Sequence, residues 1–112
     1  MAEETSRISG NISGADNTDS DELVLQEGGV VVVDYTWTAG SVTLPVETSL
    51  DGGTTYVAFK DASGIAVSAD ISSTTPHYRA EFIGQAGQRF RINPSSASSA
   101  DVDYRMSVVK VA

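Results

Sequence analysis

Alternation of apolar and polar residues is the feature of this sequence that most limits how it can fold. In HYRAEFI (77–83) every second residue is apolar from Tyr78 onward, and QRFRIN (88–93) and VDYRMSVVKV (102–111) repeat the pattern. A period of two places alternate side chains on opposite faces of an extended chain, which is typical of half-buried β-strands. We find no segment with apolar residues at helical spacing between a cap and a stop signal.

About seven or eight short strands follow one another at intervals of roughly ten residues. The candidate strands are 22–26, 30–38, 41–50, 54–60, 65–71, 77–83, 88–93 and 102–111. Turn residues separate them, and Ala39-Gly40 is expected to end the strand 30–38. The chain has 112 residues, enough for one modest core. We therefore predict an all-β fold: a single β-sandwich or small barrel of antiparallel strands.

The first 21 residues differ from the rest in composition. Ile8 and Ile12 are their sizeable apolar residues, and Ser, Gly, Asn, Asp and Thr fill most other positions. Such a stretch cannot alone bury enough surface to offset its ordering entropy. We predict an extended N-terminal arm over 1–21 and a β-sandwich domain over 22–112. The arm could lie on its own domain or on a neighbouring subunit, and we favour the neighbour.

The net charge of −8 is concentrated near the N-terminus. Residues 1–34 hold eight acids against Arg7, whereas residues 35–112 hold seven acids and six bases. Because this acidic leader would repel phosphate backbones, we expect no nucleic-acid partner. The longest purely apolar run, Val30 to Val33, is far too short to span a membrane, so we expect no membrane association.

The segment SLDGGTTY (49–56) resembles the Asp-box of sialidase-type propellers, S/T-x-D-x-G-x-T-W. In that motif an aspartate and glycines shape a hairpin turn and an aromatic packs beneath it. The matching residues here are Asp51, Gly52, Gly53, Thr55 and Tyr56. The hairpin would join 41–50 to 54–60. Because there is one such box and a propeller needs several four-stranded blades, we interpret the segment as a structural turn.

Candidate catalytic and metal-binding residues are few. His77 is the only histidine, the chain has no cysteine, and no G-x-S-x-G motif is present. Nothing around Asp101 and Asp103 suggests an apolar pocket that would raise either pKa. DNTDSDE (16–22) could offer oxygen ligands to calcium, but it lacks the spacing and the glycine of an EF-hand. We predict no catalytic residue, no metal and no cofactor.

Four arginines, by contrast, fall on the outward sides of their predicted strands: Arg79, Arg89, Arg91 and Arg105. If the strands are neighbours, these residues form a basic face that could bind the acidic arm of a second copy or a larger protein lattice. The candidate contact residues of the arm are Ile8, Ile12, Asp16, Asp19, Asp21 and Glu22. The alternative is four scattered arginines that only keep the protein soluble.

The middle of the chain, VTLPVETSLDGGTTYVAFKDASGIAV (42–67), resembles short β-sandwich structural proteins of tailed bacteriophages, over about residues 41–92. The resemblance implies a head decoration or cement protein, made in the host cytoplasm and located on the virion capsid surface. Its partner would be the major capsid protein or another virion protein, with a homo-oligomer such as a trimer also expected. A position on the tail or at the head–tail junction remains an alternative.

A carbohydrate-binding or adhesion β-sandwich is the second interpretation. That function normally uses exposed aromatic side chains as stacking platforms, and the candidates are Tyr35, Trp37, Tyr56, Tyr78 and Tyr104. All but Tyr35 are expected on core faces, although Trp37 shares the strand parity of Tyr35.

Overall fold

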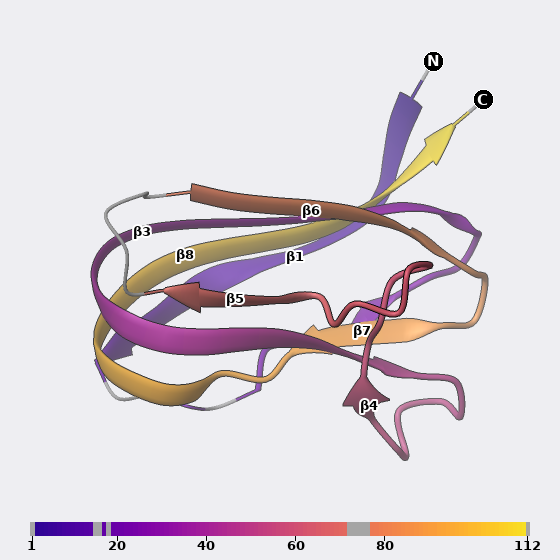
Figure 1. Ribbon diagram of the computed structural model, residues 1–112. Helices are drawn as coiled ribbons and strands as arrows, with labels where there is room; N and C mark the ends of the chain where they lie inside the picture. Colours follow the sequence, from indigo (N-terminus) through magenta and orange to yellow (C-terminus); the bar gives the residue numbers. More distant parts are fainter. Residues whose placement is uncertain (1, 15–16, 18, 72–76, 112) are drawn as a thin grey trace.

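The computed structural model describes residues 2–14, 17, 19–71 and 77–111. In that part of the chain the structure is all-β, which confirms the predicted fold class, and no helix in it could cross a membrane. The strands are Ala2–Gly14 (β1), Leu23–Val24 (β2), Gly29–Ser49 (β3), Val57–Ala58 (β4), Ser68–Ile71 (β5), His77–Gly84 (β6), Arg89–Ile92 (β7) and Ser95–Val111 (β8). They pair antiparallel in two packed layers, as in a small sandwich (Figure 1).

Strand β3 belongs to both layers and is the centre of each. Its first half pairs with β6 on one side and with β8 on the other, and β1 lies beyond β8. Its second half pairs with β4 and β5 on one side and with β7 on the other. Beyond β7 lies β2. Strands β1 and β2 therefore end the hydrogen-bonded path β1-β8-β3-β7-β2.

Strands β3 and β8 bend together at one end of the molecule (Figure 1). Their register shifts between Trp37 and Thr43, and Gly40 has a φ of 80°, which favours glycine. Extra residues of this kind bend a strand without ending it. The predicted turn at Ala39-Gly40 is therefore wrong, and so is the expectation that all strands are short. β3 has 21 residues and β8 has 17, and both pass through the bend.

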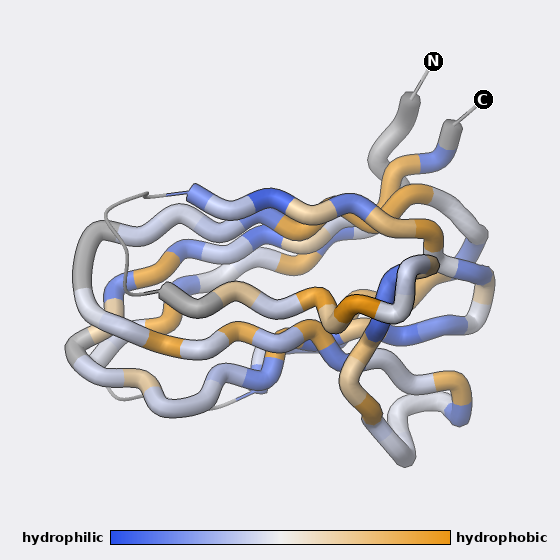
Figure 2. Tube along the Cα trace, in the orientation of Figure 1, coloured by the Kyte–Doolittle hydropathy of each residue, from blue (hydrophilic) through white to orange (hydrophobic). Residues whose placement is uncertain are grey.

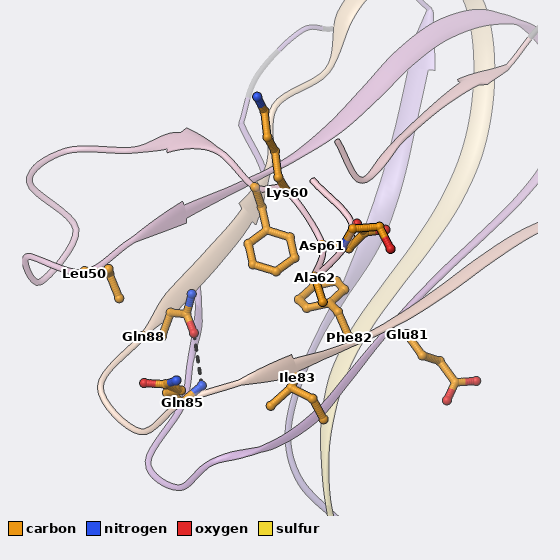
Figure 3. A pocket seen from close by; sticks show the side chains of 11 residues that line it. Leu50, Lys60, Asp61, Ala62, Glu81, Phe82, Ile83, Gln85 and Gln88 are labelled. Carbon is orange, nitrogen blue, oxygen red and sulfur yellow. Dashed lines mark hydrogen bonds between the residues drawn. The ribbon is translucent and has the colours of Figure 1, made fainter. Parts of the chain in front are cut away.

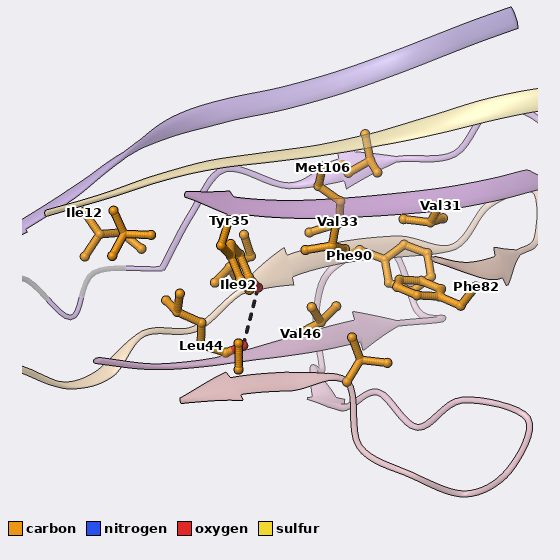
Figure 4. Packing of buried hydrophobic residues seen from close by; sticks show 14 of the residues in the cluster. Ile12, Val31, Val33, Tyr35, Leu44, Val46, Phe82, Phe90, Ile92 and Met106 are labelled. Carbon is orange, nitrogen blue, oxygen red and sulfur yellow. Dashed lines mark hydrogen bonds between the residues drawn. The ribbon is translucent and has the colours of Figure 1, made fainter. Parts of the chain in front are cut away.

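The alternation along the strands builds the core between the layers (Figures 2 and 4). Strands β6 and β7 bury alternate residues as predicted. Tyr35, which we expected to be exposed, is fully buried, and its hydroxyl lies 3.4 Å from the Leu44 carbonyl oxygen as a donor. Leu50 is 79% exposed, because β3 ends at Ser49 and the chain turns away.

The N-terminal segment is part of the fold, which corrects the predicted boundary between an arm (1–21) and a β-domain (22–112). β1 pairs with β8 along its length, Ile12 is buried in the core, and Ile8 packs against it. Pairing with β8 satisfies backbone N–H and C=O groups, so two isoleucines suffice where we expected more apolar surface to be needed. The segment is extended as predicted, and in this single chain it lies on the chain's own domain.

Candidate functional site

The turn between β3 and β4 is organised around the carboxylate of Asp51. Its Oδ1 accepts hydrogen bonds from the Ser49 hydroxyl at 2.7 Å and from the Thr55 backbone N–H at 2.9 Å. The Gly53 N–H donates to the Ser49 hydroxyl oxygen at 3.0 Å. Gly52 and Gly53 have φ values of 76° and 92°, a region that side chains rarely tolerate. The residues of SLDGGTTY therefore form a hydrogen-bonded turn, with each glycine at a position that needs one.

This turn borders a cluster that we call the carboxylate cradle, formed by Tyr56, Arg89 and Arg91, with Gly53 as its floor. Glu22 occupies it: Arg89 Nη1 lies 3.1 Å from Glu22 Oε1, and the Tyr56 hydroxyl donates to Oε2. A Cβ at Gly53 would lie 2.6 Å from that same Oε2. Glycine at this position therefore leaves the space that the carboxylate fills.

Arg91 lies in the same cradle and joins three parts of the chain. Its Nη1 is 3.1 Å from Asp19 Oδ2, and its Nε donates to Glu47 Oε1 at 2.8 Å. The guanidinium carbon is 3.9 Å from the centroid of the Tyr56 ring, a cation–π contact. The other oxygen of Glu47 accepts from the Asn93 amide at 3.2 Å. Arg91 thus ties β7 to β3, to the turn and to the segment that precedes β2.

The protonation states of the cradle suit this arrangement. The Tyr56 hydroxyl, followed by the charge of Arg89, lowers the pKa of Glu22 despite the opposing effect of its partial desolvation. Burial, followed by the hydrogen bond to Glu22, raises the pKa of Tyr56 to about 12. At neutral pH the cradle therefore holds an ionised carboxylate against a phenol that remains a donor.

A second cluster surrounds Asp34 on the outer face of the other layer. Arg79 of β6 and Arg105 of β8 lie opposite Asp34 of β3 in register. Their guanidinium nitrogens are 3.5 and 3.3 Å from the carboxylate, and His77 Nε2 is 3.4 Å away. These residues, with Thr36, Asp103 and Tyr104, line a shallow depression of about 420 Å³. One carboxylate thus links three strands.

The four predicted arginines do not form one basic face. β6 and β8 flank the first half of β3, whereas β7 flanks the second half, so the arginines divide between the two layers. Each of them is paired with acidic residues of its own chain. The sequence predicted their outward direction but not their neighbours, because strand order does not follow from alternation.

The predicted contact residues of the arm also meet their own chain. Asp19 and Glu22 bind the cradle, Asp21 is exposed, and the two isoleucines pack as described above. Asp16 lies outside the described residues. In this single chain the acidic residues Glu22 and Asp19 thus pair with Arg89 and Arg91 of the same chain.

A groove at the end of the molecule opposite the bend (Figure 1) was not predicted. Figure 3 shows that its lining is mixed: apolar residues lie beside Lys60, Asp61, Ser63, Glu81, Gln85 and Gln88. Its volume is about 570 Å³, with Phe59 and Phe82 among its lining residues, beside Leu50 and Ile83. Ile83 is 71% exposed, and Val57, 58% exposed, shares an adjoining hollow with Leu50. Ile83 does carry a signal in the sequence, because it is apolar at an outward position of HYRAEFI.

Among the described residues no group of three or more His, Cys, Asp or Glu side chains is arranged to hold a metal. No protein-family model, curated protein or solved structure matches the chain.

Proposed function

We propose that this chain is a non-enzymatic structural protein of a tailed-phage virion, which decorates the capsid shell and stabilises it. Its partner is the major capsid protein, and copies of the chain associate on the shell, with a trimer at a symmetry axis as one arrangement. The observation that carries the proposal is how the surface is divided. Many charged side chains pair across the chain's own strands, whereas two exposed large apolar side chains, Leu50 and Ile83, line one groove with Phe59 and Phe82.

The paired charges support the role of a rigid body. The Arg91 contacts hold β7 against β3, and the Asp34 contacts hold β6, β3 and β8 together. Exposed ion pairs contribute only about 0–1 kcal/mol each, so their main effect is to fix which strands lie together. A protein that reinforces a shell needs such fixed geometry and no reactive group.

The groove supports a protein partner. Leu50 and Ile83 are large apolar side chains left mostly in water, next to two phenylalanines that line the same hollow. Burial of a side chain of this size contributes about 1.5–3 kcal/mol. Clustered exposed apolar residues mark interaction sites more often than single ones do. The groove is therefore the surface that we assign to the shell subunit.

The resemblance of residues 41–92 to short β-sandwich phage proteins directs the proposal to a virion. It is tested by immunogold electron microscopy of particles released from cells that carry the gene, using antibodies raised against the purified chain. The proposal predicts gold over the capsid shell. Gold confined to tails, or particles without label although the cells contain the chain, would contradict it.

A carbohydrate-binding module is the alternative, and the depression around Asp34 is the observation that favours it. Carboxylates and guanidinium groups of the kind found there bind sugar hydroxyls. Its wall includes Tyr104, which is only half-buried. Glycan-array binding by the isolated chain, abolished by Asp34→Ala together with Arg79→Ala, would support this alternative over shell decoration.

A further inference from the structure

The N-terminal segment adds the outermost strand to each of the two layers. We call residues 2–14 and 19–25 the clip, and residues 29–111, as far as they are described, the body. Within the clip, β1 pairs with β8 in one layer, and β2 pairs with β7 in the other. Neither strand pairs with a further described strand, so β1 and β2 end the hydrogen-bonded path. The body's own strands pair with one another without the clip.

Buried apolar side chains and hydrogen bonds hold the clip against the body. Leu23 and Leu25 are fully buried, and Ile12 is 4% exposed. The Ser20 N–H donates to the Ile92 carbonyl at 2.9 Å, and the Ile92 N–H donates to the Ser20 hydroxyl oxygen at 2.8 Å. Buried apolar side chains, backbone hydrogen bonds and ion pairs therefore all hold the clip against the body.

The carboxylate cradle makes the body selective for this clip. Its cationic side chains, Arg89 and Arg91, receive Glu22 and Asp19, and the missing side chain of Gly53 leaves room for the Glu22 carboxylate. A segment that fills the site must therefore be acidic and must carry apolar residues where Leu23 and Leu25 lie. A second copy of this chain carries such a segment.

The connection between clip and body is short and exposed. Gln26, Glu27 and Gly28 are exposed and lie outside the strands, and Gly29 begins β3. Within this connection Glu27 makes an ion pair with Lys110 at 3.1 Å, between two side chains that are each about half exposed. A change of backbone direction over these residues would carry the clip away from its own body as a unit.

We propose that the clip is exchanged between two copies of the chain, so that each clip completes the two layers of the other copy's body. Every contact between clip and body described above is kept in the exchanged dimer, and only the path of residues 26–28 differs, together with the Glu27–Lys110 ion pair. Exchange of an identical element is a low-cost route to a dimer. The proposal concerns the chain alone and holds whether or not it belongs to a virion.

Cross-linking distinguishes the exchanged dimer from the closed monomer. Because the chain has no cysteine, only the introduced cysteines can react. Ser9 of β1 lies opposite Arg105 of β8. The double variant Ser9→Cys/Arg105→Cys is refolded at low and at high concentration and treated with a short bis-maleimide. Because a tethered segment has an effective concentration on the order of 1 mM, refolding above that value favours exchange. We expect a covalent dimer on denaturing gels after concentrated refolding, and a cross-linked monomer after dilute refolding.

A matched control places both cysteines within the body. Thr36 of β3 lies opposite His77 of β6, and Thr36→Cys/His77→Cys is expected to cross-link within one chain at either concentration. A non-covalent dimer of the first variant that gives only cross-linked monomer would overturn the proposal, because its clips stay on their own bodies. A monomer at every concentration would overturn it as well. Ser13→Cys/Asp101→Cys, another facing pair, replaces the first variant if that one fails to fold.

Shortening the connection gives a second, independent measurement. Deletion of Gln26 and Glu27 shortens the connection from three residues to one, which should hinder the clip from reaching its own body more than from reaching another. We expect this variant to be a folded dimer by light scattering at concentrations where the parent chain is a monomer. A folded monomer would contradict the exchange.

Discussion

Gly53 shows at the scale of one residue how the turn and the N-terminal segment depend on each other. Its φ of 92° serves the turn, and its missing side chain leaves space for the Glu22 carboxylate. Gly52 has a φ of 76°, and a Cβ added to it would meet no atom within 4 Å, so it serves the turn only. Comparison of the two glycines therefore separates the effect of positive φ in the turn from the effect of the space left for the Glu22 carboxylate.

The first prediction compares Gly53→Ala with Gly52→Ala. A left-handed backbone costs a residue with a side chain about 1–2 kcal/mol, and both variants should lose about that much stability in urea denaturation. Gly53→Ala should lose more, because it also displaces Glu22 from Tyr56 and Arg89. In a Glu22→Gln background this excess should shrink. Equal losses for the two variants in both backgrounds would show that the contacts of the Glu22 carboxylate with Tyr56 and Arg89 add no measurable stability.

The second prediction concerns Asp51 and pH. The Thr55 backbone N–H, followed by the Ser49 hydroxyl, lowers the pKa of Asp51 to about 2 from an ordinary 3.8. A lowered pKa in the folded state means that the ionised carboxylate stabilises the fold above about pH 4, and that this contribution is lost as the pH falls through 2. The stability difference between the parent chain and Asp51→Asn should be full at pH 6 and should decrease below pH 4 in pH-dependent denaturation. A difference independent of pH would be contrary to the hydrogen-bonded carboxylate.

Residue-scale features were predictable where they depend on neighbours in sequence. SLDGGTTY indicates its turn because the aspartate, the serine and the glycines that build it lie within eight residues. The pairing of Glu22 with Arg89 was not predictable in this form, since 67 positions separate them. Tyr35 was misassigned because its strand has large apolar residues at both parities, from Val30 to Val33.

At the scale of elements, β1 is the strand whose place in the fold is least evident from its composition. It has two sizeable apolar residues, yet it pairs with β8 along its length. Ile12, which is 4% exposed, is its main anchor in the core. The neighbouring Ser13 is exposed and contributes only backbone pairing.

The third prediction is that Ile12→Ala loosens β1. Removal of a buried isoleucine side chain to alanine costs about 2–5 kcal/mol, and this position should lie toward the low end because it is in an outermost strand. Ser13→Ala in the same strand should change stability by less than about 0.5 kcal/mol. Urea denaturation of both variants checks this expectation. A loss for Ile12→Ala no larger than that for Ser13→Ala would place β1 outside the core.

Elements were predictable where alternation is uninterrupted, as in β6 and β7. The sequence could not show that β3 continues through Gly40, because a glycine with positive φ occurs both in turns and in bulges. It also could not show that the N-terminal segment pairs with β8, because edge pairing is made by backbone groups that every residue has. The scarcity of apolar residues in that segment therefore suggested a separate arm, because backbone pairing cannot be read from composition.

At the scale of the whole molecule, the exposed side chains of Leu50 and Ile83 lie at one groove, away from the two clusters of paired charges. The charged clusters connect strands on the outer faces of the two layers, and the groove lies at the end opposite the bend. Composition predicted an acidic protein without showing this groove, because the groove depends on where the fold brings Leu50 and Ile83 together. This arrangement underlies the proposed attachment to a shell.

The fourth prediction tests the groove. If the proposed shell attachment holds, Leu50→Asp and Ile83→Asp should each weaken binding to capsid shells of the proposed virion, purified without this chain, by about tenfold or more. Each substitution removes at least about 1.5 kcal/mol of stabilisation from apolar burial. Ile65→Asp is the control, because Ile65 is 64% exposed but does not line the groove. Sedimentation with shells measures the binding. Equal weakening by all three substitutions would assign the effect to net charge and not to the groove.

The central claim is that the N-terminal segment is an edge strand of the folded sheet and not a free arm, which leaves the groove as the surface for a partner. Hydrogen exchange of the dilute, purified monomer tests it most directly. The backbone N–H groups of β1 that pair with β8 should exchange at least ~100-fold more slowly than in the unfolded chain, an opening free energy of about 2.7 kcal/mol. Exchange of β1 at the unfolded rate, while β3 and β6 stay protected, would contradict the account.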